Sequence, residues 1–453
     1  MQTETSIESD RLNPVERFVD WLTGQEAAAG MLLIVFAAIA LAWANSPWGH
    51  IYEHLLHMHA TVGIGGYALD LSLLHWINDG LMVIFFFQVG LEIKREFLTG
   101  ELSTPKEAAL PLVAALGGIL FPALIYTGFN WGGVGISGWG VPMATDIAFA
   151  IGVIVLLGKK APLPLKVFLT ALAIVDDMAA VVVIAVFYTS KLSLVALSVS
   201  AILLGIMVLL NVFRFRSVSL YLVLGACLWI AVLQSGVHAT IAGVLAAMTI
   251  PDRRRLDFGQ FVASSREVFD EMADRVRDTG RGPTEQETDA IHAIEERAQG
   301  AGSMLRRLEH SLEPWVYYLI MPIFALGNAG VALSGEMTAT AFGSAATITF
   351  GVIIGLAVGK QLGVTLFSWM AVKAGWADLP GNVDWLQMYG VAWLTGIGFT
   401  MALFIANLAF TDTMLLNSAK IGILLASTIA GLGGWAVLSY AHRRKDRARQ
   451  VRG

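Results

Sequence analysis

Two adjacent aspartates, Asp176 and Asp177, lie inside an otherwise apolar run, PLPLKVFLTALAIVDDMAAVVVIAVFY. A run of about twenty such residues is long enough to cross the hydrocarbon core of a bilayer as a helix. An ionised carboxylate at that depth costs at least ~2.5 kcal/mol, so acidic residues there mark ion or proton pathways. The pair therefore predicts a site that binds a cation, a proton, or each in turn.

Three further segments place polar or helix-breaking residues inside apolar sequence. VPMATDIAFAIGV contains Thr145 and Asp146, whose side chains can hydrogen-bond to the local backbone in competition with regular helix. GVAWLTGIGFTMALFIANLAF contains Gly396 and Gly398, and IGLAVGKQLGVTLF contains Lys360 as a lone cation. Interrupted helices at membrane depth are tolerated only where protein or a cavity surrounds them. Two of them in corresponding halves of a chain indicate the binding site of a transporter.

The interrupted segments belong to two units that enter the membrane from opposite faces. The unit 107–189 and the unit 342–441 each contain three expected helices, and each has its break in the second one. This arrangement predicts an inverted repeat. Opposed half-helix ends bring like partial charges together, so Asp146 could neutralise two facing N-termini, and Lys360 could act near facing C-termini or an aspartate.

The composition indicates a polytopic membrane protein. Of 453 residues, 56% are hydrophobic and 14% are charged, whereas a soluble domain carries about 25% charged residues. Cys227 is the lone cysteine, which excludes a disulfide framework. The sequence lacks the GxxxxGK[ST] pattern of a phosphate-binding loop, so the expected energy source is the proton gradient and not ATP. We expect no enzymatic activity, no cofactor and no nucleic-acid partner.

Apolar runs of spanning length predict about twelve transmembrane helices, and an even number places both termini on the same side. The runs lie roughly at 29–46, 76–98, 107–127, 143–158, 163–189, 193–213, 218–234, 237–250, 314–333, 342–372, 386–411 and 416–441.

Charge bias predicts that both termini are cytoplasmic. Connections rich in Lys and Arg alternate with connections that contain neither, and basic connections stay on the cytoplasmic side. The connections without Lys or Arg are 47–75, 128–142, 234–238 and 334–341. The expected organisation is a cytoplasmic segment 1–28, helices one to eight in 29–250, a cytoplasmic excursion with amphipathic helices in 251–313, helices nine to twelve in 314–441, and a basic cytoplasmic tail 442–453.

Several long stretches resemble signatures of the NhaA family of sodium/proton antiporters, from about residue 15 to residue 441. They are ALAIVDDMAAV, ATDIAFAIGV, INDGLMVIFFFQVGLEIKREFLTGEL, SGVHATIAGV, LEHSLEPW, FALGNAGV and GIGFTMALFI. The resemblance implies the NhaA fold, in which inverted repeats are a known feature. It also implies pH-regulated exchange of Na⁺ or Li⁺ for H⁺, a homodimer in the lipid bilayer, and a place in the bacterial inner (plasma) membrane.

The resemblance also implies roles for individual residues. Asp177 matches the aspartate that binds sodium and exchanges it for protons, and Asp176 matches an essential neighbour that can pair with Lys360. Asp146 and Thr145 match the residues at the first helix break, where they would join the cation or proton site. Both aspartates, Asp177 and Asp176, are the expected ligands of Na⁺, a hard cation that prefers oxygen.

A second group of residues matches those associated with the pH response of the family. They are Glu92, Arg95, Glu96, Glu309 and His310, together with His238. Two features depart from the family pattern. Glu313 replaces a histidine, which puts histidine-based pH sensing in doubt, and the 251–305 excursion is longer than the family leads us to expect.

Other interpretations of the same residues remain open. The aspartate pair could be buried for packing, Lys360 could be purely structural, and Asp146 could serve only the helix ends. The charged residues Glu92, Lys94, Arg95 and Glu96 could be a solvated helix end. His238 could be a core histidine whose hydrogen bonds are satisfied. A cation channel or a proton-coupled symporter of an organic solute would also use acidic residues at depth. A single acidic pair in one repeat and few polar lining residues favour the antiporter, in which Na⁺ and H⁺ compete for the same oxygens.

Overall fold

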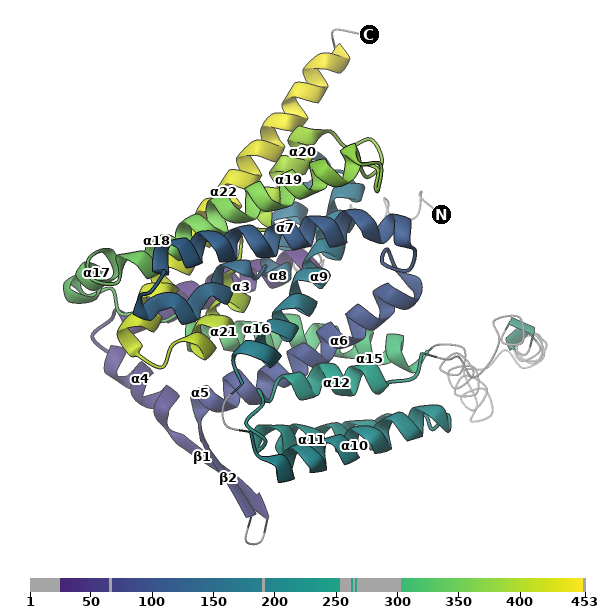
Figure 1. The fold of residues 1–453 in the computed structure, drawn as a ribbon, viewed down its shortest axis with the longest axis vertical. Coiled ribbons are helices and arrows are strands. Elements are labelled where there is room, and N and C mark those ends of the chain that lie inside the picture. The colour runs from purple at the N-terminus through teal and green to yellow at the C-terminus, as the bar shows by residue number, and fades with distance from the viewer. Residues whose placement is uncertain are drawn as a thin grey trace, which may run out of the picture.

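The structure is a computed structural model that describes residues 25–64, 67–189, 192–252, 262–263, 265–266 and 303–450. Most of this part of the chain is helical, and the helices form one packed bundle (Figure 1). Six helices there are long and apolar enough to cross a membrane, and three bent helix pairs raise the number to at most nine. A mainly helical polytopic membrane protein with interrupted helices is thereby confirmed, whereas the described residues hold at most nine candidate spans against the twelve or so expected. The amphipathic helices expected within 251–313 fall mostly outside the described residues.

The helices of the first half follow the predicted apolar runs closely. They are α3 (Gln25–Ala44), α5 (Leu73–His75), η1 (Trp76–Leu81), α6 (Met82–Thr99), α7 (Pro105–Asn130), η2 (Val134–Met143), α8 (Ile147–Leu157), η3 (Gly158–Lys160), α9 (Leu163–Phe187), α10 (Leu194–Val212), α11 (Val218–Leu233) and α12 (Ile241–Thr249).

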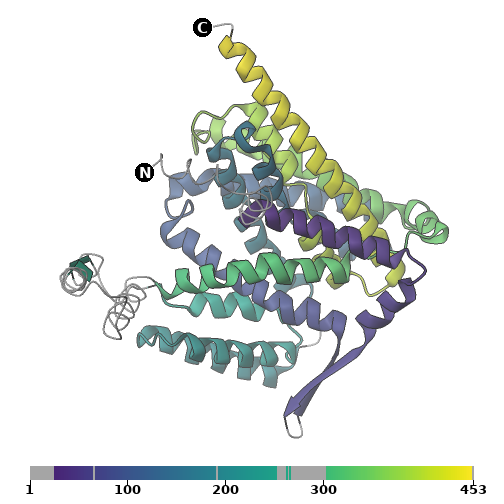
Figure 2. The same cartoon turned by 180° about the vertical axis from the view of Figure 1, so that it is seen from behind.

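The second half begins with α15, ahead of the run expected from residue 314. Its elements are α15 (Met304–Trp315), η4 (Val316–Ile320), α16 (Met321–Asn328), α17 (Gly335–Phe342), α18 (Ala346–Ile354), η5 (Gly355–Gly359), α19 (Lys360–Lys373), α20 (Trp385–Leu394), α21 (Phe399–Ala409) and α22 (Thr413–Gln450). The last helix continues through the described part of the basic tail. Figure 2 shows α22 extending beyond the bundle, and α3 beside α16.

A β-hairpin interrupts the helical pattern where only a connection was expected, in 47–75. It consists of β1 (His59–Ile64) and β2 (Tyr67–Ser72), which are antiparallel and pair from His59↔Ser72 to Ile64↔Tyr67. It follows the short helix α4 (Gly49–His57) and projects from the bundle (Figure 1). The segment alternates polar and apolar residues with a period of two, which favours a strand, and such short strands carry no signal in a search for long apolar runs.

The first helices of the two units cross each other at a pair of glycines. Gly117 of α7 and Gly363 of α19 lie so close that a Cβ added to either would collide with the carbonyl group of the other. Small residues allow this approach of two backbones in membrane helices. The crossing fixes α19, and with it Lys360, against the first unit.

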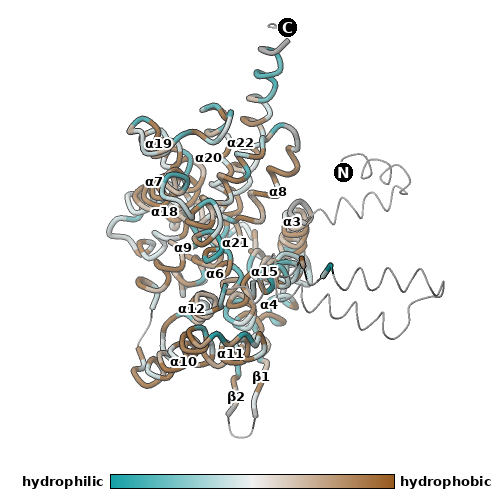
Figure 3. Tube along the Cα trace, turned by 90° about the vertical axis from the view of Figure 1, so that its right-hand side faces the viewer, coloured by the Kyte–Doolittle hydropathy of each residue, from teal (hydrophilic) through white to brown (hydrophobic). Residues whose placement is uncertain are grey.

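The outer helices present apolar side chains away from the bundle. Over the most apolar 18 residues of α10, 11% are buried within the bundle, compared with 67% over those of α9. Figure 3 shows α10 and α11 as hydrophobic and the C-terminal end of α22 as hydrophilic. This pattern is the one expected of helices that face lipid, with α9 in the interior of the bundle.

Candidate functional site

The first break separates η2 from α8, and the two helices meet at an angle of 42°. Asp146 ends the break as the N-cap of α8, and its carboxylate accepts a hydrogen bond of 3.0 Å from the backbone N–H of Phe149. An N-cap side chain of this type satisfies one of the free amides at a helix start. The local competition between side chain and helix that the sequence predicted is therefore visible in the structure.

The second break separates α20 from α21, which meet at 46°. A Cβ added to Gly396 would lie 2.5 Å from the carbonyl oxygen of Leu356, and one added to Gly398 would lie 3.0 Å from that of Ala144. Only glycine leaves space for this approach of backbones. Because Ala144 belongs to the first break, the glycines allow the two breaks to touch.

Asp146 joins the two breaks through its backbone and its carboxylate. Its N–H donates a hydrogen bond of 2.7 Å to the carbonyl of Ile397. Its Oδ2 accepts hydrogen bonds from the backbone N–H and from the hydroxyl of Thr400, at 2.9 and 2.5 Å. The starts of α8 and α21 therefore both direct amides to one buried carboxylate, which is favourable because helix N-termini carry partial positive charge.

Lys360 reaches Asp176, the first aspartate of the pair, from the other unit. Its Nζ forms an ion pair with Oδ2 of Asp176 and donates to the hydroxyl of Thr145 at 2.8 Å. The Thr145 hydroxyl lies 2.6 Å from the same Asp176 oxygen and 2.9 Å from the carbonyl of Thr395, and it can donate to one of them at a time. Lys360 follows the π-helical segment η5, and such segments are frequent at functional sites.

Asp177 differs from its neighbour in having no partner. Its side chain is completely buried, and neither carboxylate oxygen has a hydrogen-bond partner among the described residues. Adjacent residues of a helix point about 100° apart, so Asp177 cannot share the direction in which Asp176 meets Lys360. Buried polar atoms are nearly always hydrogen-bonded, so a bare carboxylate at this depth requires a functional explanation.

The residues expected to take part in the pH response are only partly brought together. Arg95 donates from Nε to Glu309 at 2.7 Å, and its Nη1 lies 2.7 Å from Glu96. Glu92 instead accepts a hydrogen bond of 3.3 Å from Gln88. His310 is exposed and does not join this group, because its Nδ1 faces Glu313 at 3.8 Å.

His238 lies elsewhere, just before α12. It is half-buried, near Asp79 of η1 and the backbone of Tyr188. In the part of the chain that the structure describes, it makes no ion pair with the residues around Arg95. The residues that the family resemblance associates with pH response therefore form two separate places in this fold.

Sequence reasoning assigned no role to two residues of the region. Thr400, the second partner of Asp146, stands two residues after Gly398, where a hydroxyl in the first turn of a helix was the available signal. Gln88 stands four residues before Glu92, and this spacing places the two side chains on one face of α6.

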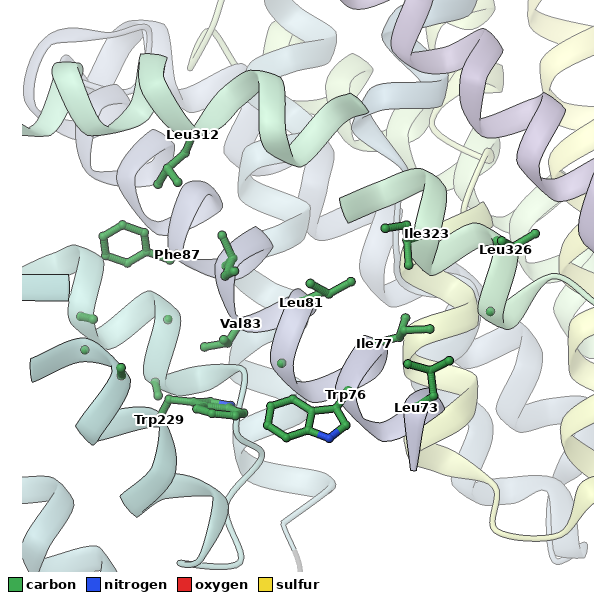
Figure 4. A pocket seen from close by; sticks show the side chains of 18 of the residues that line it. Leu73, Trp76, Ile77, Leu81, Val83, Phe87, Trp229, Leu312, Ile323 and Leu326 are labelled. Carbon is green, nitrogen blue, oxygen red and sulfur yellow. The ribbon is translucent and has the colours of Figure 1, made fainter. Parts of the chain in front are cut away.

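A large apolar cavity lies at a different place in the bundle. Its volume is about 760 Å³, and it lies between α5, η1, α6, α11 and α16, with Trp76 and Trp229 facing each other (Figure 4). Among the described residues that line it, none is an Asp, Glu, Lys or Arg. A cation would have no counter-charge among these residues, which makes the cavity a poor place for one.

Comparisons with known proteins agree with the geometry. Residues 21–438 match the family Na⁺/H⁺ antiporter 1. The chain is 50% identical to the Na⁺/H⁺ antiporter NhaA of Oleidesulfovibrio alaskensis, over 93% of both chains. It is 49% identical to that of Koribacter versatilis, over 94% of this chain and 91% of the relative, and 42% identical to that of Rhodospirillum rubrum, over 95% and 98%. The chain therefore belongs to the NhaA family and is a Na⁺/H⁺ antiporter.

Proposed function

We propose that Asp177 is the residue at which this antiporter exchanges Na⁺ for H⁺. The observation that carries the proposal is the buried Asp177 carboxylate, whose two oxygens have no partner among the described residues. A hard cation takes oxygen ligands, and a carboxylate that holds a proton cannot hold the cation at the same oxygens. If the site opens to one side at a time, this competition becomes exchange.

Asp176, Thr145 and Asp146 support the exchange site in different ways. The free Oδ1 of Asp176 can add a ligand for Na⁺, while its Oδ2 is bound by Lys360 and Thr145. When Na⁺ adds positive charge beside Asp177, the ammonium of Lys360 is the group that it repels. Asp146 holds the starts of α8 and α21 together, so it acts on the shape of the site.

The proposal is tested in everted membrane vesicles that carry a pH-sensitive dye. Na⁺ should collapse a respiration-generated pH difference in the wild type, and Asp177→Asn should abolish this response while leaving the protein folded. Asp378→Asn is a matched control, because Asp378 is an exposed aspartate that pairs only loosely with Lys106, at 3.4 Å. Na⁺-dependent exchange that persists in Asp177→Asn would assign the site elsewhere.

The physiological direction and setting follow from the same proposal. Extrusion of sodium against external protons would serve sodium and pH homeostasis. Transport of Li⁺, a homodimer, the bacterial inner membrane, and cytoplasmic termini rest on the family resemblance and on the alternation of basic connections. Li⁺ in place of Na⁺ in the vesicle assay, cross-linking in the membrane, and accessibility of a tag on each terminus test these points separately.

We also propose that the group around Arg95 makes exchange depend on pH. Burial raises the pKa of Glu309, which lies ahead of the expected span 314–333, and Arg95 offsets part of that rise. A carboxyl with a raised pKa stabilises the folded arrangement below its ordinary pKa, and this contribution is lost as the pH rises through the raised value. Alkaline conditions should therefore loosen the contact between α6 and α15.

The variant Glu309→Gln keeps a neutral side chain at every pH, so it should move activation to higher pH. The charged groups that act on Glu309 are Arg95, Glu313 and Arg306, and Glu92 lies near enough to interact with it. His310→Ala is the control, because His310 is exposed and outside the ion pairs of Arg95. An unchanged pH profile in Glu309→Gln would remove this residue from the proposed regulation.

A further inference from the structure

A narrow cavity lies between the ion pairs of Arg95 and the helix breaks. Gln88 and Glu92 of α6 line it, facing Ile147 of α8, Met401 of α21 and Tyr317 of η4. Its volume is about 10 Å³, which is room for roughly one water molecule. Residues 85, 88, 89 and 92 all line it, and this spacing is one face of a helix.

Gln88 is an unusual side chain for this position. It is 2% exposed, and its Nε2 donates a hydrogen bond of 3.3 Å to Oε1 of Glu92. Its Oε1 has no partner among the described residues. A buried amide oxygen without a partner destabilises a fold, whereas a leucine or methionine of similar volume would fill the same space at no such cost.

The cavity lies between the two parts of the site. Glu92 stands one turn before Arg95 and Glu96, so it marks the end of the cavity nearest the ion pairs of Arg95. Ile147 follows Asp146 directly, and Met401 follows Thr400, so these two residues mark the end nearest the breaks. An ion that moves through this cavity, from the ion pairs of Arg95 to the helix breaks, must pass the oxygens of Gln88 and Glu92.

We propose that Gln88 is a cation-coordinating residue of the transport path. Its amide oxygen and the carboxylate of Glu92 form a transient station that replaces part of the hydration shell of Na⁺ before the ion reaches Asp177. A hard cation accepts a carbonyl oxygen and a carboxylate oxygen as ligands. The neutral amide adds a ligand without adding charge, so the ion can leave again. This inference rests on the proposed function of Asp177.

The test compares three variants by the Na⁺ dependence of exchange in vesicles. Gln88→Met keeps length and burial but removes the ligand, and it should raise the KM for Na⁺ about tenfold with a maximal rate within about twofold of the wild type. Gln88→Glu keeps the oxygen ligand and should give a KM equal to or below that of the wild type. Ser368→Ala is the control, because Ser368 is also buried without a partner among the described residues but does not line the cavity.

The outcomes separate this inference from the function of Asp177. A KM in Gln88→Met within about twofold of the wild type overturns the station. If Gln88→Met does not fold, Gln88→Glu decides, since a raised KM in that variant overturns the station and an equal or lowered one supports it. A loss of exchange in Asp177→Asn alongside an unchanged Gln88→Met would leave the exchange site intact and remove only the station.

Discussion

The two helix breaks have similar shapes and different chemistry. The first bends by 42° and the second by 46°. The first contributes side chains, with Thr145 bound to Lys360 and Asp146 serving the starts of two helices. The second contributes mainly backbone, with Gly396 and Gly398 allowing close approach. Two breaks of similar shape can therefore differ in charge, with a carboxylate at the first and none at the second.

The largest effect should come from Asp146→Ala, which removes the acceptor of both helix starts. An N-cap side chain contributes typically about 1 kcal/mol and up to ~2, so loss of two caps should cost about 2 to 4 kcal/mol of stability. Thermal unfolding in detergent measures the loss of stability, and exchange in vesicles measures the effect on transport. Asp146→Asn is the milder companion, since it keeps an acceptor oxygen. If Asp146→Ala melts at the same temperature as the wild type, the Asp146 side chain does not stabilise the starts of α8 and α21.

Gly396→Ala should give the next largest effect, because its Cβ would lie 2.5 Å from the carbonyl oxygen of Leu356. Overpacking of this kind costs about 1 to 3 kcal/mol, and here it also separates α20 from η5. We expect a lower melting temperature and slower exchange. Gly128→Ala in α7 is the control, because nothing lies within 4 Å of a Cβ built there. If both variants behave alike, close approach is not what the second break requires.

Thr400→Val removes one of the hydrogen bonds that Asp146 accepts and leaves the backbone amides of Thr400 and Phe149 in place. A single hydrogen bond contributes about 1 kcal/mol, or somewhat more when the acceptor is charged. The melting temperature should fall by less than in Asp146→Ala. A loss as large as that of Asp146→Ala would show that the Thr400 hydroxyl, and not the helix amides, stabilises the carboxylate.

Thr395→Val should have the smallest effect. Among the described residues, the Thr395 hydroxyl donates to the carbonyl of Ala392 in the preceding turn and has no other partner, and its backbone carbonyl stays available to Thr145. Side-chain bonds of this local type are close to neutral, so we expect a change of less than ~0.5 kcal/mol. Exchange rates that fall as far as in Thr145→Val would show that the second break supplies side-chain chemistry after all.

Much of the fold could be predicted from apolar runs, because a span of membrane length is a strong signal. Each predicted run contains helix in the structure, and both interruptions occur where Thr145, Asp146, Gly396 and Gly398 indicated. The start of α15 was missed because that helix is amphipathic. It buries Met304, Leu305 and Leu308 on one face, and its polar face keeps it out of a search for continuous apolar sequence.

The site was predictable in its residues and less so in its contacts. The energetic cost of buried carboxylates singled out the aspartate pair, whereas the pairing of Lys360 with Asp176 came from the family resemblance. The inequality of the aspartates depends on which way each side chain points, and that is set by the packing of α9 against its neighbours. Gln88 was missed because glutamine in an apolar helix, unlike a carboxylate, carries little signal by itself.

The glycine crossing of α7 and α19 has a mechanical consequence. At Gly117 and Gly363 the two main chains touch without any side chain between them, so the contact has no soft layer that could be compressed. Such a joint permits rotation about the crossing point but resists separation and sliding. A change of access from one side of the membrane to the other, as the proposed exchange requires, would then rotate α7 and α19 about this point, with sliding confined to helices that meet through longer side chains. Lys360, three residues before Gly363 and therefore close to this pivot, would travel little while the rest of the bundle moves.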